Sequence, residues 1–212
     1  MSNQTKTVTT TTEAPQDTRG RVRYLTVTAM LAAVSFILQY FEISLPIMPP
    51  FIKFDFSDIP ALLGSFAFGP VCGVLICLVK NLLHMAFSNS MFVGELSNFL
   101  LGSAFVIIAG SIYKYKKTKM GALAGGVLGA IVMGVFSIAS NWFVVYPAYY
   151  QVMPKEAILG AYQAILPSMK SIFQSLVVFN LPFTIAKGLI AVAFCMLIYK
   201  PLSPILKGAK NR

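Results

Sequence analysis

Long apolar segments recur along the chain and constrain its fold more than any other feature. A helix needs about 20 mostly apolar residues to cross the hydrocarbon core of a bilayer. Only 11% of the residues are charged, against roughly 25% in soluble domains. The sequence therefore predicts an all-α fold, an integral membrane bundle of six transmembrane helices. Their expected positions are about 23–41, 58–68, 71–87, 95–113, 121–145 and 177–199.

Basic residues predict how this bundle is oriented. They gather at 19–23, at 114–119 and at 200–212. With six spans all three clusters fall on one side, which the positive-inside rule makes the cytoplasm, whereas five or seven spans would divide them. Both termini are therefore predicted to be cytoplasmic. The net charge of +10 comes from these clusters, so we expect no nucleic-acid partner.

The domain organisation follows from the same pattern. Residues 1–20 are rich in threonine and predict a disordered cytoplasmic tail. Residues 21–202 are predicted to form one six-helix membrane domain, and 203–212 a basic cytoplasmic tail. The segment 154–173 predicts a separate amphipathic helix on the outer side, interrupted at Pro167. The helix at 58–68 is too short to span unaided, and we expect it to be tucked against neighbours or to cross only partly.

Polar residues inside apolar helices are candidates for a binding site, because burying them in a membrane costs free energy. Asn180, Thr184 and Lys187 are spaced i, i+4, i+7 and share one face of the last helix. They predict the wall of a polar pocket. The alternative is that Lys187 snorkels to a headgroup or pairs with a carboxylate that holds the bundle together.

Further candidates lie at the outer ends of other segments. Glu95 and Asn98 form either part of the pocket or a solvated helix start, and Asn141 either binds ligand or makes an interhelical hydrogen bond. Lys53 and Asp55 flank the proline-rich loop. Weaker candidates are Asp58, Lys80, Asn81 and His84. Since almost all of these groups fall in the outer half, they predict a cavity that opens outward rather than a continuous pore.

Other functional classes lack the residues that they need. The seven acids and one histidine form no cluster suited to an intramembrane enzyme, and the three cysteines and His84 match no metal or redox motif. No phosphate-binding glycine loop is present, so active transport would draw its energy from a partner or an ion gradient. Ala29 and Ala33, with Ala32 adjacent, form a small-xxx-small pair that permits close helix approach, either inside the protein or to another subunit.

Five motifs in order carry a resemblance to a known family. They are KFDFSDIPALLG at 53–64, FAFGP at 66–70, KNLLH at 80–84, GELSNF at 94–99 and PFTIAKG at 182–188. Together they resemble the substrate-binding (S) subunits of energy-coupling factor (ECF) transporters, and among these the subunits specific for riboflavin. The resemblance covers roughly residues 23–202.

The resemblance implies a six-helix subunit of a bacterial plasma membrane that captures riboflavin from outside, with FMN as a second candidate ligand. It implies a partner module of one transmembrane coupling protein and two ATPases, docked on the alanine surface of the first helix. It places ligand-binding roles on Lys187 and Asn141. Two positions depart from the family pattern: Thr184 stands where asparagine is frequent, and Cys77 where glutamate is frequent.

The chemistry of the candidate residues agrees with a flavin ligand. An amide such as Asn141 can both donate to and accept from the imide edge of the ring, and Lys187 can donate to a ring carbonyl. Trp142, Tyr146 and phenylalanines supply stacking surface. The alternatives are an S subunit for another vitamin, such as thiamine or pantothenate, and a structural or sensory membrane protein without cargo.

Overall fold

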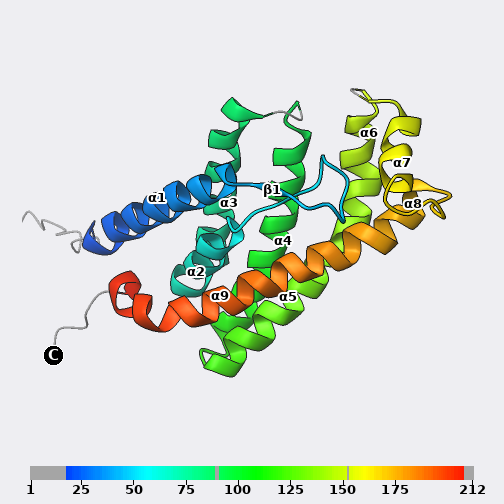
Figure 1. Cartoon of the computed structure of the whole chain (residues 1–212). Coiled ribbons are helices and arrows are strands. Elements are labelled where there is room, and N and C mark those ends of the chain that lie inside the picture. Colours follow the sequence, from blue (N-terminus) through cyan, green and yellow to red (C-terminus); the bar gives the residue numbers. More distant parts are fainter. Residues whose placement is uncertain (1–17, 89–90, 152, 208–212) are drawn as a thin grey trace, which may run out of the picture.

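The structure, a computed structural model, describes residues 18–88, 91–151 and 153–207 (Figure 1). The long helices are α1 (Thr18–Tyr40), α3 (Pro70–His84), α4 (Val93–Tyr115), α5 (Lys119–Ser140) and α9 (Leu181–Lys207), with the shorter α2 (Asp58–Phe68). The smaller elements are β1 (Ile43–Ser44), β2 (Lys53–Phe54), η1 (Met85–Phe87), η2 (Asn141–Val145), α6 (Tyr146–Tyr149), α7 (Lys155–Gln163), α8 (Ile172–Ser175) and η3 (Leu176–Asn180).

The all-α membrane bundle predicted from the sequence is confirmed. Five helical segments in the described residues are long and apolar enough to cross a bilayer, namely 20–40, 70–87, 93–115, 119–149 and 172–199, and α2 is a shorter apolar helix. The segments 119–149 and 172–199 are longer than expected because the π-helical turns η2 and η3 join α5 to α6 and α8 to α9.

The predicted amphipathic helix at 154–173 is wrong in its second half. Helix α7 ends at Gln163, and Ile172 already belongs to the last membrane helix. The interruption expected at Pro167 is present, since residues 164–171 are not helical, and Ser171 starts the next helix by accepting a hydrogen bond from the backbone N–H of Gln174. Two short helices therefore replace the single one.

The predicted tails need smaller corrections. Residues 1–17 lie outside the described residues, but Thr18–Gly20 are already helical. At the other end α9 continues through Pro201 and Pro204 to Lys207, beyond the expected boundary at 202. Residues 208–212 again lie outside the described residues.

The short helix α2 is an interior element rather than a lipid-facing span. Its 11 residues extend about 16 Å at 1.5 Å per residue, and nine of them are buried. The loop before it forms the antiparallel β1–β2 pair, with Ile43 opposite Phe54, and then enters the bundle, where Asp55 and Ser57 are buried. Irregular backbone is tolerated at membrane depth when protein surrounds it, so the loop and α2 together make the crossing that α2 is too short to make alone.

Glycines allow α5 to lie directly against α4. A Cβ atom on Gly125 would come within 2.8 Å of the Ala109 carbonyl oxygen, and one on Gly129 within 3.0 Å of the Phe105 carbonyl oxygen. Any larger residue would force the helices apart. Gly125 and Gly129, one turn apart on α5, therefore serve packing inside this protein.

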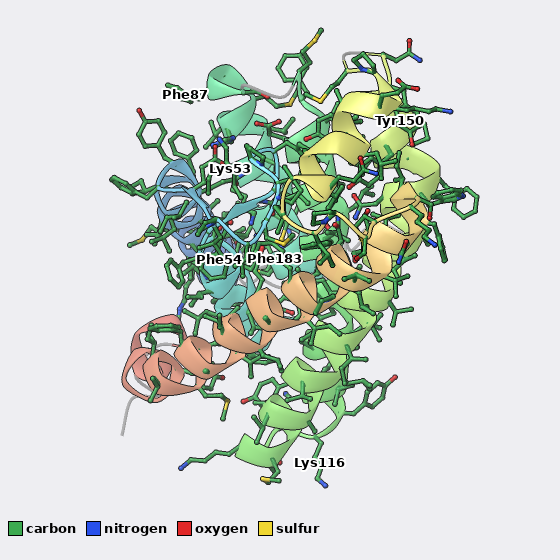
Figure 2. All side chains as sticks on the ribbon, turned by 45° about the vertical axis from the view of Figure 1, so that its right-hand side comes forward. Lys53, Phe54, Phe87, Lys116, Tyr150 and Phe183 are labelled. Carbon is green, nitrogen blue, oxygen red and sulfur yellow. The ribbon has the colours of Figure 1, made fainter. Side chains whose placement is uncertain are left out.

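The described parts of the basic clusters, 19–23, 114–119 and 200–207, lie at one end of the bundle. The described ends of the chain and the α4–α5 connection share that end in Figure 1, and Lys116 lies opposite Phe87 and Tyr150 in Figure 2. We call the end with the α3–α4 and α6–α7 connections the outer end. The arrangement agrees with an even number of crossings, as the charge pattern predicts.

Cysteine labelling tests this orientation. We expect a thiol-reactive, membrane-impermeant reagent to modify Lys155→Cys on intact cells and to leave Lys117→Cys unmodified until the membrane is opened. Both positions are exposed, whereas the native cysteines are buried and contribute little background. The reverse labelling pattern would refute the orientation.

Candidate ligand-binding site

A cavity of about 580 Å³ lies at the outer end of the bundle, within the size range of small-molecule sites. Residues from α1, from the loop before α2, from α3 to α7, and from η3 and α9 line it. All eight residues predicted to bind substrate are on this lining: Lys53, Asp55, Glu95, Asn98, Asn141, Asn180, Thr184 and Lys187. Whether each of them contacts a ligand stays a prediction.

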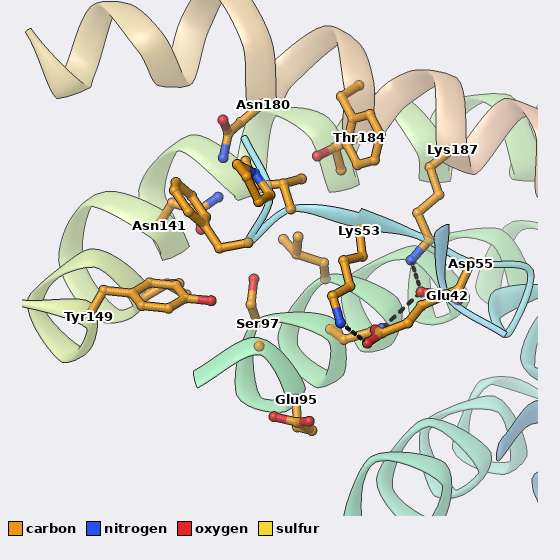
Figure 3. Close-up of a pocket in the computed structure, with 18 of the residues that line it drawn as sticks. Glu42, Lys53, Asp55, Glu95, Ser97, Asn141, Tyr149, Asn180, Thr184 and Lys187 are labelled. Carbon is orange, nitrogen blue, oxygen red and sulfur yellow. Dashed lines mark hydrogen bonds and ion pairs between the residues drawn. The ribbon is translucent and has the colours of Figure 1, made fainter. Parts of the chain in front are cut away.

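Two asparagines meet at one end of the cavity because of the π-helical turns. Asn141 is the first residue of η2 and Asn180 is the last of η3, and Figure 3 shows them on neighbouring helices, apart from Lys187 and Asp55. π-helical turns are rare and often mark functional sites. The Asn141 side chain makes no hydrogen bond to another residue in the described part of the chain, so nothing supports its predicted interhelical bond.

Tyrosines hold Asn180 in place. The Tyr162 hydroxyl donates to Asn180 Oδ1 at 2.7 Å, and it also hydrogen-bonds the Tyr146 hydroxyl. Burial raises the pKa of Tyr162 well above its ordinary value, so its proton is retained as a donor. With its carbonyl oxygen engaged, Asn180 has its amide N–H groups to offer to a ligand.

Aromatic side chains surround this amide end. Tyr146, Tyr149, Phe51 and Phe183 line the cavity. The prediction that Trp142 also supplies stacking surface is wrong, since its side chain is 43% exposed and packs edge-to-face on Phe173 outside the cavity.

Lys187 both lines the cavity and pairs with carboxylates, so its two predicted roles coexist. Its Nζ lies 2.9 Å from Asp55 Oδ2 and 3.4 Å from Asp58 Oδ2, as Figure 3 shows for Asp55. Because the residue is only 8% exposed, it does not snorkel. An ammonium has three N–H donors, so a donor is left for a ligand.

A second lysine completes a buried network behind the lining. Lys80 is fully buried, and its Nζ lies 2.8 Å from Asp58 Oδ1, with Ser57 and Asn98 as further acceptors. Two lysines thus balance two aspartates. We call Asp55, Asp58, Lys80 and Lys187 the charge quartet.

Asp55 is held in its ionised form. Its carboxylate accepts hydrogen bonds from Lys187 Nζ at 2.9 Å, from the Ser57 backbone N–H at 2.8 Å and from Asn98 Nδ2 at 3.3 Å, which favour the charged form. The loop before α2 is therefore tied to α9 by an ion pair that persists at physiological pH.

Glu95 and Lys53 are also partnered. Glu95 Oε1 lies 2.9 Å from His84 Nδ1, and Ser88 Oγ donates to Glu95 Oε2 at 2.9 Å. Glu95 is only 5% exposed, so it is not a solvated helix start. Lys53 forms a salt bridge with Glu42.

Sequence reasoning missed several lining residues, among them Gln39, Glu42, Ser97 and Tyr149. Gln39 could have been found, because a glutamine within an apolar helix carries the same signal as Asn180. Ser97 and Tyr149 carry no such signal, since serine and tyrosine are ordinary residues in membrane helices.

The alanine surface on α1 divides in two. Ala29 and Ala33 are exposed, as a docking surface requires. Ala32 is only 1% exposed and belongs to the core of the bundle. Its predicted part in partner docking is therefore wrong, because consecutive helix positions are about 100° apart and Ala32 faces inward.

A helical membrane bundle with an outward cavity, a fixed ammonium and convergent amides defines a membrane-embedded binding protein for a small polar solute. Comparison with known proteins identifies its family: residues 23–199 match the model of the ECF transporter substrate-specific component. The chain belongs to this family and is a multi-pass membrane protein of a transport system rather than an enzyme.

Individual relatives agree. The chain is 36% identical to the riboflavin transporter RibU of Staphylococcus aureus (strain TCH60), over 84% of this chain and 89% of that protein. It is 27% identical to the riboflavin transporter FmnP of Bacillus subtilis (strain 168), over 90% of this chain and 97% of that protein. A solved structure described as the S component of a bacterial ECF transporter superposes with a TM-score of 0.70 at 34% identity, over 88% of this chain and 99% of that one.

Proposed function

We propose that this chain binds riboflavin at the outer end of the membrane and delivers it through a partner energy-coupling module. The observation that carries the proposal is the cavity itself, which places two amides among aromatic rings at one end and charged and polar groups at the other. Similarity to riboflavin transporters supports it.

The two ends of the cavity fit the two parts of the ligand. The aromatic residues around Asn141 and Asn180 offer a flat apolar slot for the isoalloxazine ring. The side-chain amides of the two asparagines match the donors and acceptors of its imide edge. The hydrophilic end, with Gln39, Glu95 and Asn98, suits a chain of hydroxyl groups.

An anionic vitamin such as pantothenate fits less well. Both lysines on the lining are already paired, Lys187 with Asp55 and Lys53 with Glu42. A ligand carboxylate would meet these acids without a free cation to offset them. A neutral ligand avoids that cost.

Uptake also requires partners. We assign the exposed Ala29–Ala33 face of α1 to the transmembrane coupling protein, which would in turn carry two ATPases. Small residues allow a partner helix to approach closely.

Flavin binding by the purified protein tests the proposal. We expect the wild type to retain riboflavin, visible as flavin absorbance after dialysis. Asn141→Leu should weaken binding about tenfold, because two hydrogen bonds to the imide edge are worth about 1–3 kcal/mol together.

The choice of Asn141 separates binding from folding. Its side chain has no hydrogen-bond partner in the described part of the chain, so the leucine variant should melt like the wild type without ligand. A wild-type protein that takes up no riboflavin even when it is added in excess would refute the proposed function.

A further inference from the structure

The side-chain oxygen of Gln39, a residue that lines the cavity, is a buried hydrogen-bond acceptor without a donor among the described residues. The residue lies in the last turn of α1, lines the cavity and is only 2% exposed. Its Nε2 donates to Asn81 Oδ1 at 3.0 Å. Its Oε1 is buried and has no hydrogen-bond partner among the described residues. Buried acceptors are almost always paired, so this one calls for an explanation.

The orientation of both amides follows from the backbone. Asn81 Nδ2 donates to the Cys77 carbonyl oxygen at 2.7 Å, and a carbonyl oxygen can only accept. The other side of the Asn81 amide, Oδ1, must therefore face Gln39. Gln39 has to present its N–H₂ group to that oxygen, which leaves its carbonyl oxygen as the unpaired group. Rotating either amide by 180° alone would place two oxygens, or two N–H₂ groups, opposite each other.

The surroundings of Gln39 are rich in acceptors. Glu42 follows it on the chain, and Glu95 and Asn98 line the same cavity. The cations on the lining are already engaged by acids. A ligand group that satisfies the unpaired Gln39 Oε1 must therefore bring a hydrogen-bond donor of its own, and a neutral hydroxyl group does so without adding charge.

We propose that the Gln39 carbonyl oxygen accepts a hydrogen bond from a hydroxyl of the ribityl chain, and that Asn81, behind it, is the positioning residue that fixes this acceptor. The inference rests on the proposed function and adds to it the direction of the ligand: the polyol chain lies toward α1 and α3, and the ring toward Asn141 and Asn180.

The test compares riboflavin with lumiflavin, which keeps the ring but has a methyl group in place of the ribityl chain. Gln39→Met keeps the length of the side chain and removes the acceptor. We expect it to weaken riboflavin binding about fivefold to tenfold and to change lumiflavin binding less than about twofold. Both affinities are measured by quenching of flavin fluorescence on the detergent-solubilised protein.

Two further variants make the result specific. Asn141→Leu, at the ring end, should weaken the binding of riboflavin and of lumiflavin by the same factor. The ratio of the two affinities should therefore stay unchanged. Asn81→Leu removes the partner that orients the Gln39 amide, so the amide can rotate and its oxygen is less well placed. The ratio of riboflavin to lumiflavin affinity should therefore fall, as in Gln39→Met, but by less. A general loss of folding would lower both affinities together and would not move the ratio.

The outcomes separate the two proposals. If the wild type binds both flavins but Gln39→Met leaves their ratio unchanged, or lowers both affinities equally, the assignment of Gln39 is overturned and the riboflavin function stands. If the wild type binds neither flavin, the proposed function fails and the Gln39 assignment fails with it.

Discussion

Replacing Lys80 with methionine is expected to lower the free energy of unfolding by about 3–5 kcal/mol, the cost of leaving a buried charge without its partner. Lys80 is fully buried, and its ammonium is the group that pairs Asp58 Oδ1 at 2.8 Å. Without it the two aspartates of the charge quartet share one cation, Lys187. Such a loss is a large fraction of the stability of an ordinary protein.

Thermal unfolding in detergent, followed without ligand, measures this effect. The matched control is the double variant Lys80→Met/Asp58→Asn, which removes one cation and one anion together. Because removing a whole buried ion pair is often close to neutral, the double variant should recover most of the lost stability. If the single variant melts like the wild type, or the double variant melts below the single one, the prediction that Lys80 and Asp58 offset each other's buried charge is refuted.

Riboflavin uptake is expected to fall to background in Ala29→Trp and Ala33→Trp, while riboflavin binding stays at the wild-type level. Both side chains are exposed on α1, so a large ring there meets lipid in the free subunit and leaves the cavity intact. The ring would hold off a partner helix that needs small residues for close approach. Uptake in cells that carry the energy-coupling module, co-purification with the coupling protein, and flavin binding are measured on the same variants.

Two controls bracket this result. Ala32→Trp places the ring in the core, where Ala32 is only 1% exposed, and should abolish folding and binding together. Val135→Trp adds the same ring to α5, at a residue that is 59% exposed, and should leave uptake unchanged. Normal uptake by Ala29→Trp and Ala33→Trp would refute the docking assignment, as would loss of flavin binding in them.

The helices could be predicted from the sequence because apolar length is a local property. The cavity lining was predictable for a similar reason: an asparagine or lysine in an apolar helix stands out without knowledge of the fold. Its partners were not predictable, since Lys187 and Asp55 are 132 positions apart. Helical spacing relates residues within one helix and says nothing about which loop returns to it.

The direction of a side chain was predicted wrongly where two adjacent residues of one helix face opposite ways. Trp142 and Asn141 are adjacent, yet one points outside and the other lines the cavity. Ala32 and Ala33 divide in the same way. The β1–β2 pair was also missed, because two residues per strand are too few to leave an alternating pattern.

The π-helical turns η2 and η3 uncouple the packing of α5 and α9 from the choice of side chains presented beyond the turns. Each adds one residue to a helical turn, so that everything beyond it is rotated by about 100° relative to an uninterrupted helix. The inner parts of α5 and α9 can keep the register that packs the bundle, while the outer parts present a different set of side chains to the ligand. Substitutions beyond the turns can therefore change the side chains at the outer end without altering the close packing of α5 on α4.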